Sequence, residues 1–310
     1  MYLVIVFLSL IALATGRGEN EAPFQACLSN CASLNCSNPA NVPKLDLPLR
    51  IFQWSCIDDC KYHCMHKIVD QKVQNKKEII QYYGKWPFYR FLGMQEPASV
   101  AFSILNFWAH YKGNQRIKTR VSKLYGPRVY LLAISYAGMN AWVWSSIFHS
   151  RDKPMTEKGD YFSAMLYILC VTMQGVTRMF RLDRSLLRYV LGLVLGVFYI
   201  CHISYLSFWK FDYDYNMLAG VLIGVSTNIM WCIWAAFNWK SRPYAYKIVL
   251  SFLLILCAVG FELFDFPPLW GIFDAHSFWH LSTVPITFLV YDFLVSDAIY
   301  EVKLLKGKMK

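Results

Sequence analysis

Seven apolar segments recur through the later part of this 310-residue chain, each about as long as a helix must be to cross a bilayer. We place them near 97–113, 127–149, 160–179, 186–207, 216–238, 246–264 and 276–298. Because 56% of the residues are hydrophobic and only 16% are charged, one soluble core cannot bury all of this apolar surface. The chain is therefore predicted to be an all-α polytopic membrane protein with seven transmembrane helices.

The net charge of +11 is distributed as in a polytopic membrane protein rather than a nucleic-acid-binding protein. Lysines and arginines concentrate in the loops after the first, third and fifth segments, whereas the loops after the fourth and sixth are acidic. The positive-inside rule places the basic loops in the cytosol. We therefore expect a luminal N-terminus, a cytosolic C-terminus and no nucleic-acid partner.

The two ends of the chain carry targeting patterns. Residues 1–16 form an apolar run with small residues at its end, which is typical of a secretory signal peptide, with an uncleaved signal anchor as the alternative. A luminal cysteine-rich segment, 17–95, a seven-span domain, 96–300, and a basic cytosolic tail, 301–310, follow. Lys306 and Lys308 resemble a coat-protein retrieval signal, or they belong to a plain basic tail at the membrane.

Six of the ten cysteines cluster in the luminal segment and predict three disulfides, with the pairing left open. They are Cys27, Cys31, Cys36, Cys56, Cys60 and Cys64. A metal site that includes His63 and His66 is the alternative, which an oxidising lumen disfavours. The sequon Asn35-Cys36-Ser37 predicts a glycan on Asn35 in the same segment.

Five polar residues fall at the predicted luminal edge of the membrane segments: Ser145, His149, Asp160, His276 and His280. Ser145 and His149 are four residues apart, as are His276 and His280, so each pair shares one face of a helix. Three imidazoles offer three of the four tetrahedral positions of zinc, which leaves one position for water. The set therefore predicts a zinc-dependent hydrolase of the membrane.

The remaining polar residues have predicted roles around this set. Asp160 can orient the water and take its proton, and Ser145 can donate a hydrogen bond to the oxyanion. The alternative makes Ser145 the nucleophile and His149 its base, although each residue taken singly also has a structural explanation. His202 is a candidate for supporting a metal ligand or for substrate contact, and Asp274 for the orientation of a ligand imidazole.

The pattern Ser145-x3-His149, Asp160 and His276-x3-His280 resembles the superfamily of alkaline ceramidases, progestin-and-adipoQ receptors and related lipid hydrolases. The stretches SSIFHSRDKPMTEKGDYF, FDYDYN and LFDFPPLWGIFDAHSFWHLSTVP, with the luminal cysteines, resemble its Per-like family more specifically. This resemblance implies an enzyme that remodels glycosylphosphatidylinositol (GPI) anchors in the endoplasmic reticulum or Golgi membrane. It also implies a phospholipase A2-like removal of the sn-2 acyl chain from the phosphatidylinositol lipid of GPI-anchored proteins, with zinc bound by the three histidines.

Two other functions are compatible with the same residues. A ceramidase-like amidase would use the same metal set, but the similarity beyond the five residues disfavours it. A non-enzymatic seven-span receptor or chaperone for lipid-anchored proteins would hold zinc structurally, which usually takes four protein ligands. GPI lipid lies in the luminal leaflet, where the five residues are expected, so hydrolysis of its acyl ester is the first hypothesis.

Overall fold

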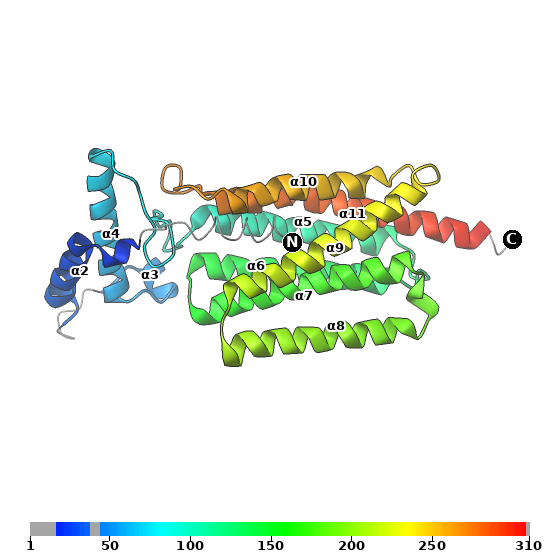
Figure 1. Cartoon of the computed structure of the whole chain (residues 1–310), viewed down its shortest axis with the longest axis horizontal. Coiled ribbons are helices and arrows are strands. Elements are labelled where there is room, and N and C mark those ends of the chain that lie inside the picture. Colours follow the sequence, from blue (N-terminus) through cyan, green and yellow to red (C-terminus); the bar gives the residue numbers. More distant parts are fainter. Residues whose placement is uncertain (1–16, 38–43, 308–310) are drawn as a thin grey trace, which may run out of the picture. The chain divides into compact units, whose positions relative to one another are not determined.

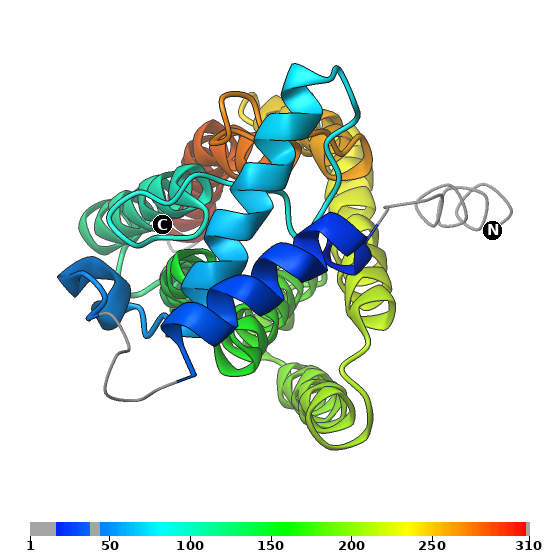
Figure 2. The ribbon, with the colours of Figure 1, turned by 90° about the vertical axis from the view of Figure 1, so that its left-hand side faces the viewer.

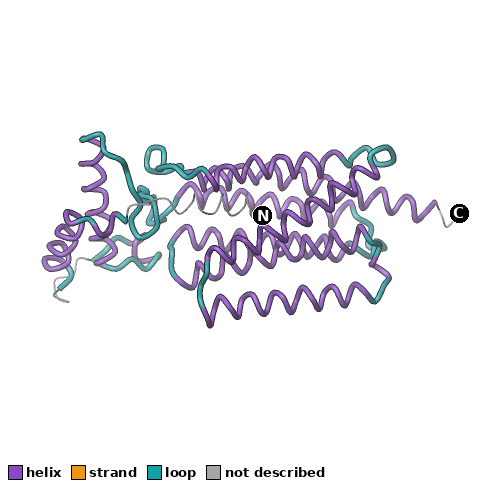
Figure 3. The backbone as a smooth tube through the Cα atoms, in the orientation of Figure 1, coloured by secondary structure: helices purple, strands orange, loops and turns teal. Residues whose placement is uncertain are grey.

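The computed structural model describes residues 17–37 and 44–307, and within these ranges it contains helices but no β-strand (Figure 3). The all-α class is therefore confirmed for the described residues. The signal peptide expected at 1–16 and Lys308 lie outside them. The chain divides into two compact units, of which the N-terminal one holds the residues up to Ser99 with His149–Arg151 and Phe261–Phe278. The remaining residues form the second unit, which we call the bundle unit.

Two helices braced by disulfides form the first part of the N-terminal unit. They are α2 (Ala22–Asn35) and α4 (Cys56–Gln74), with the short η1 (Gly18–Asn20) and α3 (Leu47–Ile51) beside them in sequence (Figure 2). The disulfides are Cys27–Cys64, Cys31–Cys60 and Cys36–Cys56, with Cα–Cα distances of 5.7, 5.8 and 5.8 Å. The three predicted disulfides are thus confirmed, and their nested order means that α2 and α4 run in opposite directions.

A small apolar cluster lies beside this disulfide ladder. Phe24 and Tyr82 are almost completely buried and pack with Cys64, Ile68 and Val69. A segment of this size cannot bury enough apolar surface to be stable by itself, so cross-links between α2 and α4 supply the missing stability.

The alternative metal site near His63 and His66 is not formed. All six cysteines of the segment are oxidised in the three disulfides, so none offers a thiolate. His66 is buried instead against aromatic rings, and its Nε2 lies 3.1 Å from the carbonyl oxygen of Phe88.

Seven long helices follow and lie mostly in the bundle unit (Figure 1). They are α5 (Pro97–Arg120), α6 (Arg128–Ser150), α7 (Pro154–Met179), α8 (Leu187–Ser204), α9 (Tyr213–Asn238), α10 (Tyr246–Leu263) and α11 (Ala275–Gly307). The short η2 (Leu182–Arg184) precedes α8, and a π-helical turn, η3 (Tyr205–Trp209), follows it. Each long helix coincides with one of the seven predicted apolar segments.

Three of these helical segments are long and apolar enough to cross a membrane. They are Leu187–Trp209, Tyr213–Asn238 and Ala275–Gly307. The protein is therefore a membrane protein, whereas the crossing of the bilayer by all seven helices stays a prediction.

The polar residues of α5 explain why its hydropathy is low. Ser103, Asn106, His110 and Asn114 recur every three or four residues and are no more than 2% exposed. They have partners inside the bundle: Nδ1 of His110, for example, lies 2.8 Å from the hydroxyl of Tyr291. Four of the polar side chains that lower the hydropathy of α5 thus form a stripe that faces protein, which we call the α5 polar stripe.

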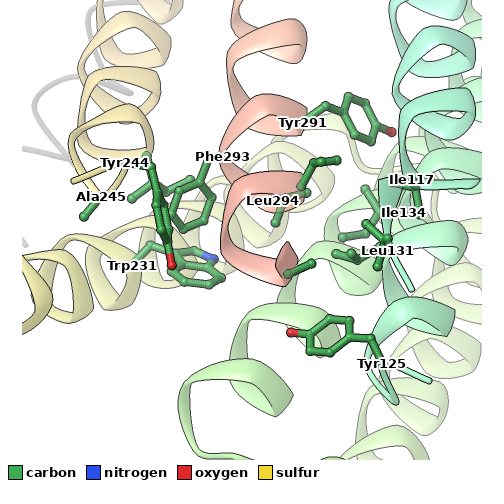
Figure 4. Close-up of a cluster of buried hydrophobic side chains, with 14 of the residues drawn as sticks. Ile117, Tyr125, Leu131, Ile134, Trp231, Tyr244, Ala245, Tyr291, Phe293 and Leu294 are labelled. Carbon is green, nitrogen blue, oxygen red and sulfur yellow. The ribbon is translucent and has the colours of Figure 1, made fainter. Parts of the chain in front are cut away.

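The hydrophobic core of the bundle unit gathers around α11 (Figure 4). The ring of Phe293 packs against Trp231, Trp234 and Tyr244, with centroid distances of 5.0, 5.9 and 6.0 Å. Tyr291 is also buried in this core. Aromatic packing holds one stretch of α11, and the α5 polar stripe holds another. Together these contacts fix the orientation of α11 in the bundle unit.

Candidate metal centre

Three of the predicted site residues are histidines with the surroundings of metal ligands. His149 lies at the end of α6, one turn after Ser145, while His276 and His280 lie one turn apart at the start of α11. Within the N-terminal unit, the ring centroids of His149 and His276 are 5.1 Å apart.

Each of the three imidazoles has an oxygen partner at Nδ1. The Nδ1 partners are Oε2 of Glu96 for His149 at 2.7 Å, Oε2 of Glu262 for His276 at 2.8 Å, and Oγ of Ser103 for His280 at 3.0 Å. A neutral imidazole that donates its proton from Nδ1 carries its lone pair on Nε2. Nε2 is therefore the nitrogen that each ring can offer to a metal.

This donor set fits zinc. Catalytic zinc sites commonly use three protein ligands and keep the fourth position for water or substrate. A ligand histidine usually donates its other N–H to a carboxylate or another oxygen, which fixes the ring and raises its basicity. The sulfurs of Cys36, Cys56 and Cys60 also lie close together, but they are in disulfides and cannot bind a metal as thiolates.

Glu96 holds His149 through both its backbone and its side chain. The backbone N–H groups of Gln95 and Glu96 donate to the carbonyl oxygens of Ser150 and His149, at 2.9 and 3.0 Å. These carbonyls belong to the last turn of α6, which lacks intrahelical donors for them. Burial would raise the pKa of the Glu96 carboxyl, but Lys85, at 3.0 Å, and His149 hold that pKa well below its usual range. The carboxylate is thus ionised.

The residues just after His149 are tied to the disulfide-braced helix α4. Arg151 pairs with Asp58 at 2.9 Å and lies over the ring of Trp54 at 3.7 Å. Arg90 lies over the same ring at 3.6 Å and pairs with Asp59 at 2.9 Å. Because Asp58 also belongs to the capping box that begins α4, the start of that helix fixes the segment that carries His149.

Several neutral groups of the bundle unit contact His280. The Oγ of Ser103 lies 3.0 Å from Nδ1 of His280 and 3.0 Å from Oγ of Ser145. Asn106 donates from Nδ2 to the carbonyl oxygen of His280 at 2.7 Å, and the ring of Trp142 packs edge-on against the imidazole. The α5 polar stripe therefore brings Ser145 and His280 to a common hydroxyl, that of Ser103.

Asp160 and His202 are placed less directly with respect to the predicted chemistry. Asp160 lies in the second turn of α7 and is half-buried, and its function as a general base stays a prediction. His202 is buried, with Nδ1 3.2 Å from the hydroxyl of Tyr215 and Nε2 3.0 Å from Oδ1 of Asn216. These bonds give His202 a role in joining α8 to the start of α9.

The sequence suggested that Asp274 orients a ligand imidazole, but its hydrogen bond is to the backbone of α11 instead. Its Oδ1 accepts a hydrogen bond from the backbone N–H of Ser277 at 2.9 Å, which is the interaction of a helix N-cap. The carboxylate that bonds His276 is Glu262, in the last turn of α10. Asp274 thus fixes where α11 begins.

Three residues of this centre were missed in the sequence analysis: Glu96, Glu262 and Ser103. A search for carboxylates at the same predicted membrane edge as the histidines would have found the two glutamates, because ligand imidazoles often donate to carboxylates. Ser103 offered no comparable signal, since a serine in an apolar helix usually bonds to its own backbone.

Comparison with known proteins places the chain in a family. Residues 46–298 match the model of the Per1-like family. The chain is 40% identical over 308 residues to the protein PER1 homolog of Schizosaccharomyces pombe, covering 96% of this chain and 91% of the relative. It is 39% identical over 310 residues to the GPI-specific phospholipase A2-like PGAP3 of Xenopus laevis, covering 97% and 95%. For the human protein of that name the identity is 38% over 320 residues, covering 99% and 97%.

No solved structure matches this chain. The family match nevertheless covers most of its length, and the relatives are similar from end to end. The resemblance to the Per-like family found in the sequence is therefore confirmed, and this chain belongs to the Per1-like family.

Proposed function

We propose that this chain is a GPI-anchor remodelling hydrolase that cleaves the sn-2 acyl ester of the inositol phospholipid of GPI-anchored proteins. One observation carries the chemical part of the proposal. Three histidines are each bonded to oxygen at Nδ1, as expected of imidazoles that bind a metal through Nε2. The names of the relatives, GPI-specific phospholipase A2-like PGAP3 and post-GPI attachment to proteins factor 3, support the substrate class.

In this proposal His149, His276 and His280 would hold zinc, which would supply a water acidic enough to lose a proton near neutral pH. Asp160 accepts that proton as general base. The water oxygen bonds to the acyl carbon, and the bond between that carbon and the glycerol oxygen breaks. Ser145 donates a hydrogen bond to the carbonyl oxygen as it becomes negative. The proton passes to the glycerol oxygen, so the products are a fatty acid and a lyso-lipid that stays attached to the protein anchor.

The proposed reaction sets the expected topology. All seven helices α5–α11 would cross the membrane, with residues 17–95 in the lumen and the tail 301–310 in the cytosol. The histidines would then lie at the luminal leaflet, where GPI lipid is found. We place the protein in the endoplasmic reticulum or Golgi membrane, with Asn35 glycosylated and with Lys306 and Lys308 serving coat-protein retrieval.

The direct test is mass spectrometry of GPI-anchor lipids from cells that lack this protein. Wild type and His280→Ala are re-expressed at equal abundance, together with Ser251→Ala as a matched control. Ser251 is a buried serine of α10 whose hydroxyl donates to the carbonyl of Lys247. We expect wild type and Ser251→Ala, but not His280→Ala, to restore removal of the original sn-2 acyl chain from GPI lipids.

The other outcomes identify the alternatives. Full restoration by His280→Ala would refute the proposed centre. Failure of wild type to change GPI lipids would refute the proposed substrate. A change in ceramides instead would favour the ceramidase-like amidase, because the same donor set would serve amide hydrolysis. Binding of GPI-anchored protein without any turnover would favour a receptor or chaperone.

A further inference from the structure

We propose that Ser103 is a positioning residue that sets the direction of hydrogen bonding from His280 through to Ser145, so that Ser145 offers its proton to the substrate carbonyl. This inference rests on the proposed function, because it assigns a task to a serine that neither the family pattern nor the sequence analysis includes. Its basis is the position of one buried hydroxyl between two site residues of the bundle unit.

The contacts of Ser103 define a short chain of hydrogen bonds. Its Oγ is 3.0 Å from Nδ1 of His280 and 3.0 Å from Oγ of Ser145. The three side chains are at most 5% exposed. Bulk water therefore cannot readily replace any of these three side chains as a hydrogen-bond partner. Each hydroxyl proton is donated to a buried group nearby.

A metal on His280 determines the first bond of the chain. Nε2 must then carry the lone pair that binds the metal, so the ring proton is on Nδ1. Nδ1–H donates to Oγ of Ser103, which acts as an acceptor. Ser103 thus stabilises the tautomer of His280 that can bind zinc, just as a carboxylate does for the other two ligands.

The second bond connects Ser103 to Ser145, and its direction follows from the task of Ser145. Each hydroxyl has one proton to donate. If Ser145 is to donate its proton to the developing oxyanion, then Ser103 must donate to Ser145 in the bond between them. The hydrogen bonds therefore run from the imidazole N–H to Ser103, from Ser103 to Ser145, and from Ser145 to the substrate oxygen.

The same geometry separates the two roles considered for Ser145. A nucleophilic serine needs a base to accept its proton. Ser103, which accepts from an imidazole N–H, is a poor base but an effective donor. The bond to Ser103 therefore supports Ser145 as an oxyanion donor and supplies no base to Ser145 as a nucleophile.

The residues around Ser103 keep this series of hydrogen bonds in place. Asn106, one turn further along α5, donates to the carbonyl oxygen of His280 and accepts from Thr283 at 3.1 Å. Both interactions lock α5 against the turn of α11 that carries His280. The distance between Ser103 and the imidazole is thus set by neighbouring bonds as well as by its own.

The first test measures zinc affinity in the purified full-length protein, without substrate. Wild type, Ser103→Ala, Ser145→Ala and the control Ser251→Ala are titrated with zinc against a competing chelator. We expect Ser103→Ala to weaken zinc binding by roughly 10- to 100-fold, as is typical when the partner of a ligand histidine is removed. Ser145→Ala and Ser251→Ala should bind zinc within about twofold of wild type, since neither contacts a ligand imidazole. Wild-type affinity in a folded Ser103→Ala protein would refute the tautomer role.

The second test measures turnover of GPI lipid at saturating zinc, where the loss of metal affinity no longer matters. Ser103→Ala should lower kcat by about tenfold with little change in KM, because a misdirected donor weakens stabilisation only of the transition state. In a Ser145→Ala background the same substitution should have no further effect. Losses that multiply in the double variant would refute the relay. Ser103→Thr, which keeps the hydroxyl, should recover both readouts.

These two tests distinguish failure of this inference from failure of the proposed function. If wild type binds zinc and Ser103→Ala weakens it, but no GPI lipid is cleaved, the proposed substrate is wrong and the tautomer role stands. If wild type cleaves GPI lipid but neither zinc affinity nor the double-variant kinetics depends on Ser103, the proposed function stands and this inference is wrong.

Discussion

The three histidines of the candidate centre are held by two different kinds of partner. In the N-terminal unit, His149 and His276 are bonded to the carboxylates of Glu96 and Glu262. In the bundle unit, His280 is bonded to the neutral hydroxyl of Ser103. The difference shows that a ligand imidazole can be oriented with or without an additional charge, and that the surroundings decide which is used.

The cost of burying charge explains this division. Two carboxylates in the N-terminal unit are tolerated because Lys85 pairs with Glu96, and because Glu262 remains 28% exposed at its side chain. In the bundle unit, hydroxyl, amide and indole groups contact His280. A hydroxyl there fixes the ring at little electrostatic cost and, unlike a carboxylate, can pass a hydrogen bond onward.

The largest effect is expected from removal of a ligand itself, regardless of its partner. His149→Ala and His280→Ala should each reduce zinc binding by at least about 100-fold and reduce hydrolysis to the level of the blank, because two imidazoles cannot hold a catalytic zinc ion. Zinc content by elemental analysis and turnover of GPI lipid are the measurements. Wild-type zinc content in either variant would contradict this prediction, because it would show that the substituted histidine is not a zinc ligand.

A smaller effect is expected when the buried carboxylate is neutralised. Glu96→Gln keeps an oxygen acceptor for His149 but removes the charge and its ion pair with Lys85. We expect a 10- to 100-fold loss of zinc affinity, because the partner of a ligand imidazole raises its basicity. Chelator competition is the measurement, with Glu21→Gln as control, because Glu21 pairs with Lys72 and no histidine. Equal losses in both variants would mean that the effect comes from general destabilisation.

The half-buried carboxylate of Glu262 should matter less than the fully buried one of Glu96. The side chain of Glu262 is 28% exposed, against 4% for Glu96, so solvent already screens its interaction with His276. Glu262→Gln should therefore weaken zinc binding only about two- to fivefold, in the same competition assay. A loss as large as that of Glu96→Gln would show that burial does not determine the contribution of these partners.

The contrast between these partners also shows what the sequence could predict. The helices followed from apolar segments of membrane length, and the pairs Ser145/His149 and His276/His280 followed from helical spacing. Helix α5 runs beyond its apolar segment to Arg120 because lysine and arginine are good helix formers. These predictions depend on the spacing of residues that are near each other in the chain, which can be read from a single sequence.

The partners of the histidines depend on contacts between distant residues. Glu96 and His149 are 53 residues apart, and Ser103 and His280 are 177 apart. The same limit applies to the disulfides, since six cysteines can pair in several ways and only the antiparallel alignment of α2 and α4 selects one. Asp274 illustrates the resulting error, because nearness in sequence to His276 suggested a contact that Glu262 makes instead.

The smallest effect on the metal centre is expected from Asp274 itself. As the N-cap of α11, its loss in Asp274→Ala should cost about 1 kcal/mol of stability, because the N–H of Ser277 loses its acceptor. Zinc affinity should stay within about twofold of wild type, since the ring of His276 keeps its bond to Glu262. Thermal unfolding with zinc titration on the same preparation separates the two quantities. A large loss of zinc affinity with unchanged stability would make Asp274 a partner of the centre, and the orientation of His276 would then depend on two carboxylates instead of one.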